Sequence, residues 1–309
     1  MMSNTLNRAH RHYLAGSLSA ALLIMKKFLF PTDFSANAKH ALDYGYSLAK
    51  QVKANMMICN AIIEPAEVPQ AGLVSWPAVD SEFLFKSSSH ELEQLKKRLE
   101  IKAETTGFSP EITCEYESGT VMDVINHFGN DRDVALVIIG THGSSGLSTL
   151  LLGNHTRIII DEINKPLLLV PPSAVIAPVK KIAFATDFTN PADDMKCIHK
   201  LVALAKPLNS EILLTHIYNE DDHNGTFQHL IDKFMVIVAD NANYPNIYYR
   251  EIKAQQPVSG LDWLCEHGNI DILAMVHRSH NFIDSLFRGS QTQKMAKHIP
   301  IPLLVFPAG

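Results

Sequence analysis

The sequence predicts an α/β protein made of two tandem, doubly wound parallel-sheet domains. Residues 26–35 are Lys-Lys-Phe-Leu-Phe-Pro-Thr-Asp-Phe-Ser, and residues 180–189 repeat this pattern as Lys-Lys-Ile-Ala-Phe-Ala-Thr-Asp-Phe-Thr. Residues 166–170 (Pro-Leu-Leu-Leu-Val) are likewise echoed by residues 302–306 (Pro-Leu-Leu-Val-Phe). Strand-like segments that recur in the same order indicate an internal repeat, and a chain of 309 residues is long enough for two domains.

Within the first repeat, short apolar runs alternate with amphipathic helical patterns. Strands are expected near residues 27–32, 55–62, 111–117, 134–140 and 166–170, and helices near 36–52, 88–107, 119–129 and 154–164. Strands that alternate with helices form a parallel sheet covered on both faces, with right-handed crossovers. Ligands of such open sheets bind beyond the carboxyl ends of the strands, where the strand order reverses.

The expected organisation is an N-terminal extension over 1–25, a first repeat over 26–172, a linker over 173–178 and a second repeat over 179–309. The first repeat is longer, mainly through residues 63–87, where Pro65, Pro69, Gly72 and Pro77 interrupt any regular element. We expect a tolerated surface insertion, because long loops cost little stability. A lid or a partner-binding loop is the alternative.

Composition predicts a sizeable core and gives no sign of a nucleic-acid partner. Apolar residues make up 46% of the chain and the net charge is −5. The lysines and arginines are scattered and form no basic stripe of the kind that binds nucleic acid. Cys59, Cys114, Cys197 and Cys265 form no C-x-x-C pair, which suits a reducing, cytoplasmic location.

The N-terminal segment contains a short apolar run, residues 13–25, that follows Arg8 and Arg11. This pattern is superficially similar to a signal peptide. The run is too short to span a membrane comfortably, and it leads directly into the first expected strand. We therefore expect a segment that precedes a natural start at Met25, with an appended N-terminal helix as the alternative, and no membrane partner.

The segment that follows the fourth expected strand carries the functional signal. It contains Gly140, Gly143 and Gly153, and the last of these directly precedes an expected helix. Glycine lets the backbone approach a ligand closely, and the first N–H groups of a helix favour phosphate. The spacing matches neither a Walker loop nor the dinucleotide fingerprint. It indicates a nucleotide site, although turn glycines without a ligand would give similar spacing.

The wider pattern resembles the nucleotide-binding motif of the universal stress protein family: Gly, two residues, Gly, nine residues, then Gly before a small polar residue. Residues 30–35 resemble that family's first strand and the loop after it, and 166–170 its closing strand. The resemblance covers about 26–172 and 179–307. It implies a HUP fold, similar to adenine nucleotide alpha hydrolases, with ATP, ADP or AMP bound, with or without Mg²⁺. It also implies pairing of 166–170 with 302–306 as an intramolecular pseudo-dimer; a further homodimer stays open.

The resemblance places the nucleotide at the strand ends of the first repeat. The implied site residues are Thr32, Asp33, Ala61, Ile62, Gly140, His142, Gly143, Gly153, Asn154 and Thr156. The Asp33 carboxylate would accept a hydrogen bond from adenine or ribose, or else cap the next helix, a role that Ser35 also suits. Asn154 departs from the family's usual Ser or Thr but still caps a helix. Without the resemblance, Ala61 and Ile62 would be assigned to the core.

The second repeat has lost part of the glycine pattern. Val276 stands in place of Gly140 and Ser279 in place of Gly143, while Gly289 remains. A branched side chain obstructs the close approach of backbone to phosphate, so we expect a degenerate second site. The polar loop 277–280 could instead bind another anion.

We find no assembled catalytic set, because phosphoryl transfer needs a positioned nucleophile, a charge clamp and usually a metal. No catalytic residue or metal ligand is assigned. The expected function is that of an adenine-nucleotide-binding, stress-response regulatory protein without efficient catalysis. The alternatives are a nucleotide-independent interaction module with an unknown protein partner, and a slow ATPase.

Overall fold

The structure, a computed structural model, describes residues 26–63, 81–102, 107–141, 156–219, 225–278 and 300–307. The strands of the first half are β1 (Lys27–Pro31), β2 (Asn55–Ile62), β3 (Ile112–Ser118), β4 (Val134–Gly140) and β5 (Leu167–Val170). Its helices are α2 (Ala36–Val52), α3 (Ser81–Ile101), α4 (Val121–Gly129) and α5 (Thr156–Glu162). The second half has β6 (Lys181–Ala185), β7 (Glu211–Tyr218), β8 (Ile247–Lys253), β9 (Ile272–His277) and β10 (Leu303–Pro307), with α6 (Pro191–Leu208), α7 (Gly225–Asn241) and α8 (Pro257–His267).

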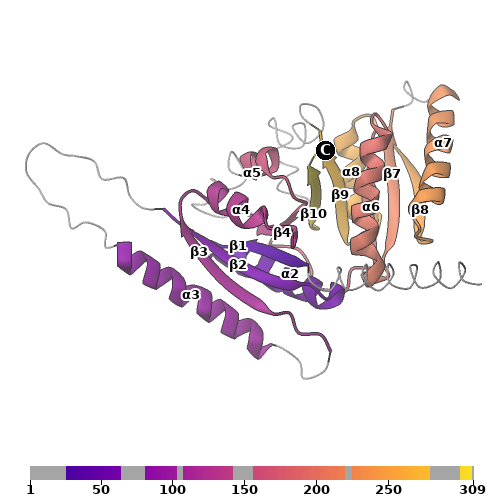
Figure 1. The fold of residues 1–309 in the computed structure, drawn as a ribbon. Helices are drawn as coiled ribbons and strands as arrows, with labels where there is room; N and C mark the ends of the chain where they lie inside the picture. Colours follow the sequence, from indigo (N-terminus) through magenta and orange to yellow (C-terminus); the bar gives the residue numbers. More distant parts are fainter. Residues whose placement is uncertain are drawn as a thin grey trace, which may run out of the picture.

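The strands form one 10-stranded sheet in the order β3-β2-β1-β4-β5-β10-β9-β6-β7-β8 (Figure 1). All neighbours are parallel apart from β5 and β10, which are antiparallel. Each half therefore has the same internal order, and this order reverses between β1 and β4 and again between β6 and β9. The predicted α/β class with two doubly wound halves is confirmed, and the two halves share one continuous sheet.

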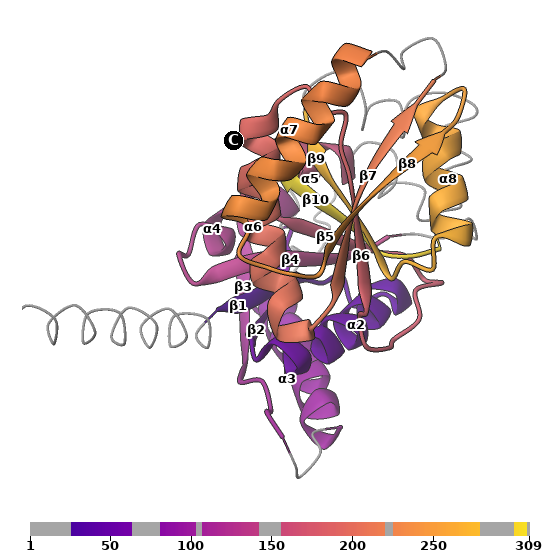
Figure 2. The same cartoon turned by 90° about the vertical axis from the view of Figure 1, so that its right-hand side faces the viewer.

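Both faces of the sheet carry an apolar layer. Along β1, Phe28 and Phe30 belong to one layer and Leu29 to the other, because successive strand residues point to opposite faces. The first layer includes buried residues of α2, α3, α6 and α7, and the second those of α4, α5 and α8. In the second half, α6 and α7 cover one face of the sheet and α8 the other (Figure 2). Among the described helices, none combines the length and the apolar character needed to cross a bilayer.

The two halves join where β5 pairs with β10. Leu169 lies opposite Leu303, Leu168 opposite Leu304, and Leu167 opposite Val305. These side chains are buried and belong to the two apolar layers, so each layer continues from one half into the other. The expected intramolecular pseudo-dimer is confirmed.

Helix α3 begins earlier than the sequence predicted. It starts at Ser81 and not near residue 88, so residues 81–87 are helical rather than part of an irregular insertion. No proline or glycine follows Pro77 in this stretch, and an i,i+4 ion pair joins Glu82 to Lys86 with a nitrogen–oxygen distance of 2.6 Å. Helix α3 also ends earlier, at Ile101 and not near residue 107. The other helices of the first half begin and end within two residues of the predicted positions.

Because Leu304 lies in the seam where β5 pairs with β10, Leu304→Ala should strongly destabilise the chain. The Leu304 side chain is only 1% exposed, and its truncation should lower the free energy of unfolding by about 3 kcal/mol. Urea denaturation measures this loss. Ile101→Ala is the control, because Ile101 is 84% exposed and its truncation should cost under about 0.5 kcal/mol. Equal effects of the two substitutions would contradict the importance of the seam.

Candidate functional site

A cavity of about 200 Å³ lies at the carboxyl ends of β1 and β4, where the strand order of the first half reverses. Four predicted site residues line it: Thr32, Asp33, Ala61 and Gly140. This is the place where doubly wound sheets bind their ligands. Ile62, another predicted site residue, lies at the end of β2 and is buried in the core.

The loop after β1 holds its shape through its own side chains. Phe34 has a φ of 62°, a left-handed conformation that is uncommon outside glycine. Its N–H donates to Thr32 Oγ1 at 3.0 Å, and the Ser35 N–H donates to Asp33 Oδ1 at 3.0 Å. Ser35 Oγ in turn accepts from the Ala38 N–H and so caps α2. Because Ser35 caps the helix, Asp33 stays exposed at the cavity and its carboxylate has further acceptor capacity.

Asn60 also lines the cavity and was missed by sequence reasoning. Its Nδ2 donates to the Thr32 carbonyl at 2.7 Å, and its Oδ1 accepts from Ser88 Oγ at 2.9 Å. The side chain therefore fastens β2 and α3 to the loop after β1. The signal for it in the sequence is an amide inside an otherwise apolar strand.

Gly140 has a packing role in addition to any contact with ligand. A Cβ atom at this position would lie 2.5 Å from the Asn37 carbonyl oxygen and 3.1 Å from the Ala38 nitrogen. The first turn of α2 thus packs directly against the end of β4. Only glycine permits this approach without displacing backbone.

Four of the predicted site residues, His142, Gly143, Gly153 and Asn154, lie outside the described residues. Thr156 is the first residue of α5. The contribution of this segment to phosphate binding stays a prediction.

The second half repeats the same loop with the same internal bonds. Phe188 has a φ of 58°, its N–H donates to Thr186 Oγ1, and the Thr189 N–H donates to Asp187 Oδ1, both at 3.0 Å. His216 replaces Asn60, with Nδ1 2.9 Å from the Thr186 carbonyl oxygen. Thr186, Asp187 and His216 line a cavity of about 380 Å³, so the second half has a counterpart of the first cavity.

Arg278 bridges the second cavity. Its guanidinium donates to Asp187 Oδ1 and Asp194 Oδ1, and to Thr189 Oγ1 at 3.1 Å. Two carboxylates thus already pair with the Arg278 side chain, and anion binding by the loop 277–280 stays a prediction. Sequence reasoning missed the pair, since Arg278 and Asp194 are 84 positions apart.

Strand register places Val276 at the position of Gly140. Gly140 lies opposite Val170 in β5, and Val276 lies opposite Phe306 in β10. The chain between β6 and α6 is one residue longer than that between β1 and α2, and Asn190 is the helix cap. Val276 packs in the core at 7% exposure, so the second half accepts a branched side chain at this position.

Asp194 is fully buried beside Arg278. Burial raises the pKa of its carboxyl, while a hydrogen bond from Thr186 Oγ1 at 2.7 Å and the nearby Arg278 guanidinium lower it. Arg278 therefore stabilises the ionised Asp194 carboxylate, which burial alone would disfavour. This makes Arg278 a structural partner of α6.

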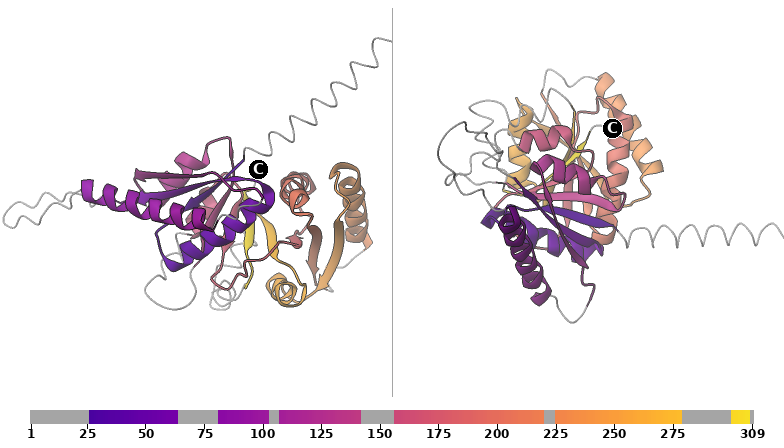
Figure 3. Two further views of the ribbon diagram at one scale, coloured as in Figure 1. Left: turned by 90° about the horizontal axis from the view of Figure 1, so that it is seen from below. Right: turned by 60° about the vertical axis from the view of Figure 1, so that its left-hand side comes forward.

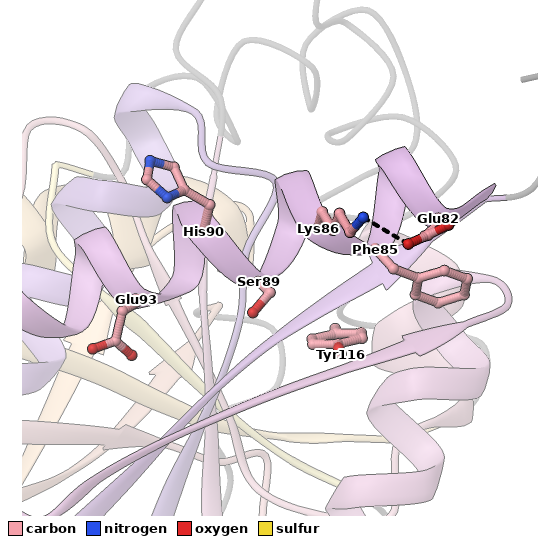
Figure 4. A pocket seen from close by; sticks show the side chains of 7 residues that line it. All are labelled: Glu82, Phe85, Lys86, Ser89, His90, Glu93 and Tyr116. Carbon is pink, nitrogen blue, oxygen red and sulfur yellow. Dashed lines mark ion pairs between the residues drawn. The ribbon is translucent and has the colours of Figure 1, made fainter. Parts of the chain in front are cut away.

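An open hollow of about 620 Å³ lies elsewhere, on the outer side of α3 and β3 (Figure 4). Phe85 and Tyr116 face one another there with ring centroids 5.9 Å apart, and Lys86 pairs with Glu82. Acidic and basic groups alternate along this helix face, as on an ordinary solvated surface. None of the predicted site residues lines it.

The comparisons with known proteins agree with this architecture. Residues 25–171 match the model of the Universal stress protein family. Universal stress protein MJ0577 of Methanocaldococcus jannaschii is 29% identical over 156 residues, which are 48% of this chain and 96% of that protein. Universal stress protein MJ0531 of the same organism is 27% identical over 149 residues, with 48% and 82% covered.

A crystal structure of a universal stress protein from Archaeoglobus fulgidus covers 93% of this chain and 98% of its own, with a TM-score of 0.66 and 18% identity. The shared fold thus extends over both halves. The first half of the chain is thus similar in sequence to universal stress proteins, and the fold shared with such a protein covers the second half as well.

Gly140→Ala should destabilise the first half. The added Cβ would meet backbone of α2, so we expect a loss of about 1–3 kcal/mol in the free energy of unfolding, measured by thermal melting. Gly129→Ala is the control, because the nearest atom to its Cβ is a leucine methyl at 3.9 Å. If both variants melt at the wild-type temperature, α2 does not pack on β4 as described.

Arg278→Gln should destabilise the chain more at neutral than at acidic pH. Without the guanidinium, the pKa of Asp194 in the folded state rises further. The unfolded state then releases the Asp194 proton at a lower pH than the folded state does. The free energy of unfolding therefore falls as the pH rises above the usual pKa range of an aspartate. We expect a loss of about 2–3 kcal/mol near pH 7 and a smaller one near pH 4, measured by urea denaturation. The matched control is Arg250→Gln, an exposed arginine whose loss should matter little at either pH.

Proposed function

We propose that this chain is an adenine-nucleotide-binding regulatory protein of the stress response, with one nucleotide bound in the first half and no efficient catalysis. The observation that carries the proposal is the difference between the two cavities. The first presents the Asp33 carboxylate at the reversal of strand order, whereas in the second Arg278 ties the equivalent Asp187 to α6.

The chemistry of the first cavity suits a nucleoside. Asp33 supplies an acceptor for an amino or hydroxyl donor, while Ala61, Ile63 and Val121 supply apolar walls for a base. The glycines of the segment after β4 would bring backbone N–H groups to the phosphates of ATP, ADP or AMP, and Mg²⁺ would accompany a triphosphate. The match of residues 25–171 to the Universal stress protein family model supports this assignment.

We propose a cytoplasmic location. The four cysteines are free, and Cys59, Cys197 and Cys265 are buried. Burial raises the pKa of the Cys197 thiol to about 11 and that of Cys265 to about 12, which keeps both thiols protonated and unreactive. Free cysteines without a disulfide suit a reducing compartment. Nucleotide occupancy would stabilise the folded first half by mass action and so alter what a protein partner, or a second copy, encounters.

Calorimetric titration with Mg-ATP tests the nucleotide site. We expect one site per chain, and Asp33→Asn should weaken binding by about tenfold or more, because it removes a charged acceptor. Asp187→Asn is the matched control from the equivalent loop of the second half and should leave the affinity unchanged. Titrations with ADP and AMP show how the affinity depends on the number of phosphates.

Gly143→Val extends the same test to the segment after β4 and should abolish binding. Two sites per chain, or equal losses from Asp33→Asn and Asp187→Asn, would contradict the assignment to the first half. Absence of binding in a folded, ligand-free sample would favour a nucleotide-independent interaction module.

A further inference from the structure

Another cavity, of about 460 Å³, lies between the two halves at the opposite edge of the sheet from the nucleotide cavity. Lys26 and Val134 line it at the starts of β1 and β4, whereas Asp33 and Gly140 follow the ends of the same strands. From the second half, Ala203 and Leu204 of α6 complete the wall. The cavity therefore exists only where the two halves meet.

The floor of this cavity is apolar. Phe28, Leu136, Leu304 and Phe306 line it and all belong to the same face of the sheet. Helices α2 and α6 contact each other on this face, one from each half (Figure 3). Between them the strands near the β5–β10 seam face an open space, which suits an apolar ligand body.

The rim of the cavity is cationic. Lys26, Arg132, Lys165 and Lys200 line it, and none of the described residues that line it carries a carboxylate. Lys165 Nζ donates to the Asp131 and Val134 carbonyls at 3.1 and 2.9 Å.

These ammonium groups lie close enough to influence one another. Burial lowers the pKa of Lys165, the Asp131 carboxylate raises it, and Lys200 and Lys26 lower it further. Asp131 pairs with Lys27 outside the cavity, at 3.8 Å. Within the described part of the chain, no ion pair engages Lys26 or Lys200. Positive charge therefore gathers at the mouth of an apolar chamber without a neutralising partner inside it.

We propose that this cavity between the halves binds a small amphipathic anion, an aliphatic chain with a carboxylate or phosphate head. The chain would lie on the Phe28 and Phe306 floor, and Lys26 and Lys200, one from each half, would hold the head. A ligand with these contacts binds both halves together, so its binding would stabilise their arrangement across the seam. The site is separate from the nucleotide cavity and does not depend on it.

Calorimetric titration of the full chain with decanoate tests the proposal, with decan-1-ol as the uncharged probe of the same chain length. Decanoate should bind at least about tenfold more tightly than decan-1-ol, because only the anion pairs with the lysines. The double variant Lys26→Gln/Lys200→Gln should remove most of this difference and leave decan-1-ol unchanged. Lys206→Gln is the matched control, because Lys206 is an exposed lysine of the same helix outside the cavity.

Decyl phosphate distinguishes the head groups: tighter binding than decanoate, lost in the same double variant, supports the anion site and assigns it a phosphate. Ala203→Trp should fill the chamber and abolish binding of every probe in a variant that still melts cooperatively. Equal affinity for decanoate and decan-1-ol would overturn the proposal, as would insensitivity to the lysine substitutions. Displacement of decanoate by Mg-ATP would also overturn it, because the probe would then occupy the nucleotide cavity.

Discussion

The antiparallel pairing of β5 with β10 is the interaction on which the whole structure depends. Each half ends in a short apolar strand at the border of its own sheet, and an exposed strand of this kind invites association with other chains. Here Leu167, Leu168 and Leu169 face the equivalent strand of the second half. The pairing satisfies the backbone of both strands and merges the two apolar layers. It also creates the cavity between the halves, near α2 and α6.

The two halves keep the same backbone device at the first strand end and differ in what surrounds it. Phe34 and Phe188 share the same left-handed conformation, and Asp33 and Asp187 accept the same backbone hydrogen bond. In the second half Arg278 binds this aspartate, whereas in the first Asp33 stays exposed at its cavity. The loop therefore keeps the same conformation in the second half, where the Asp187 carboxylate pairs with Arg278.

The sequence predicted the strands and the repeat well because both are local patterns. The strands of the first half begin and end within one residue of the expected positions, since short apolar runs bounded by turn residues leave little choice. The start of α3 was wrong, because the prolines before it ended at Pro77 and a local ion pair extended the helix.

The contacts of the site were harder to predict, because they join distant positions. Thr32, Asp33, Ala61 and Gly140 were found through a motif, and they do converge on one cavity. The close approach of Gly140 to Asn37, the amide bonds of Asn60 and the pair of Arg278 with Asp194 depend on tertiary packing. The connection before α6 is also one residue longer than the connection before α2, and such a difference carries no local signal.

The seam between β5 and β10 also changes what evolution can do with the fold. Two separate subunits joined at this seam would have identical sites, and their association would depend on concentration. When both partners belong to one polypeptide, a substitution in one half is not copied into the other. Arg278 could therefore arise beside Asp187 while Asp33 kept its place at an open cavity. Covalent linkage therefore allows the two halves of a nearly symmetric arrangement to carry different sites.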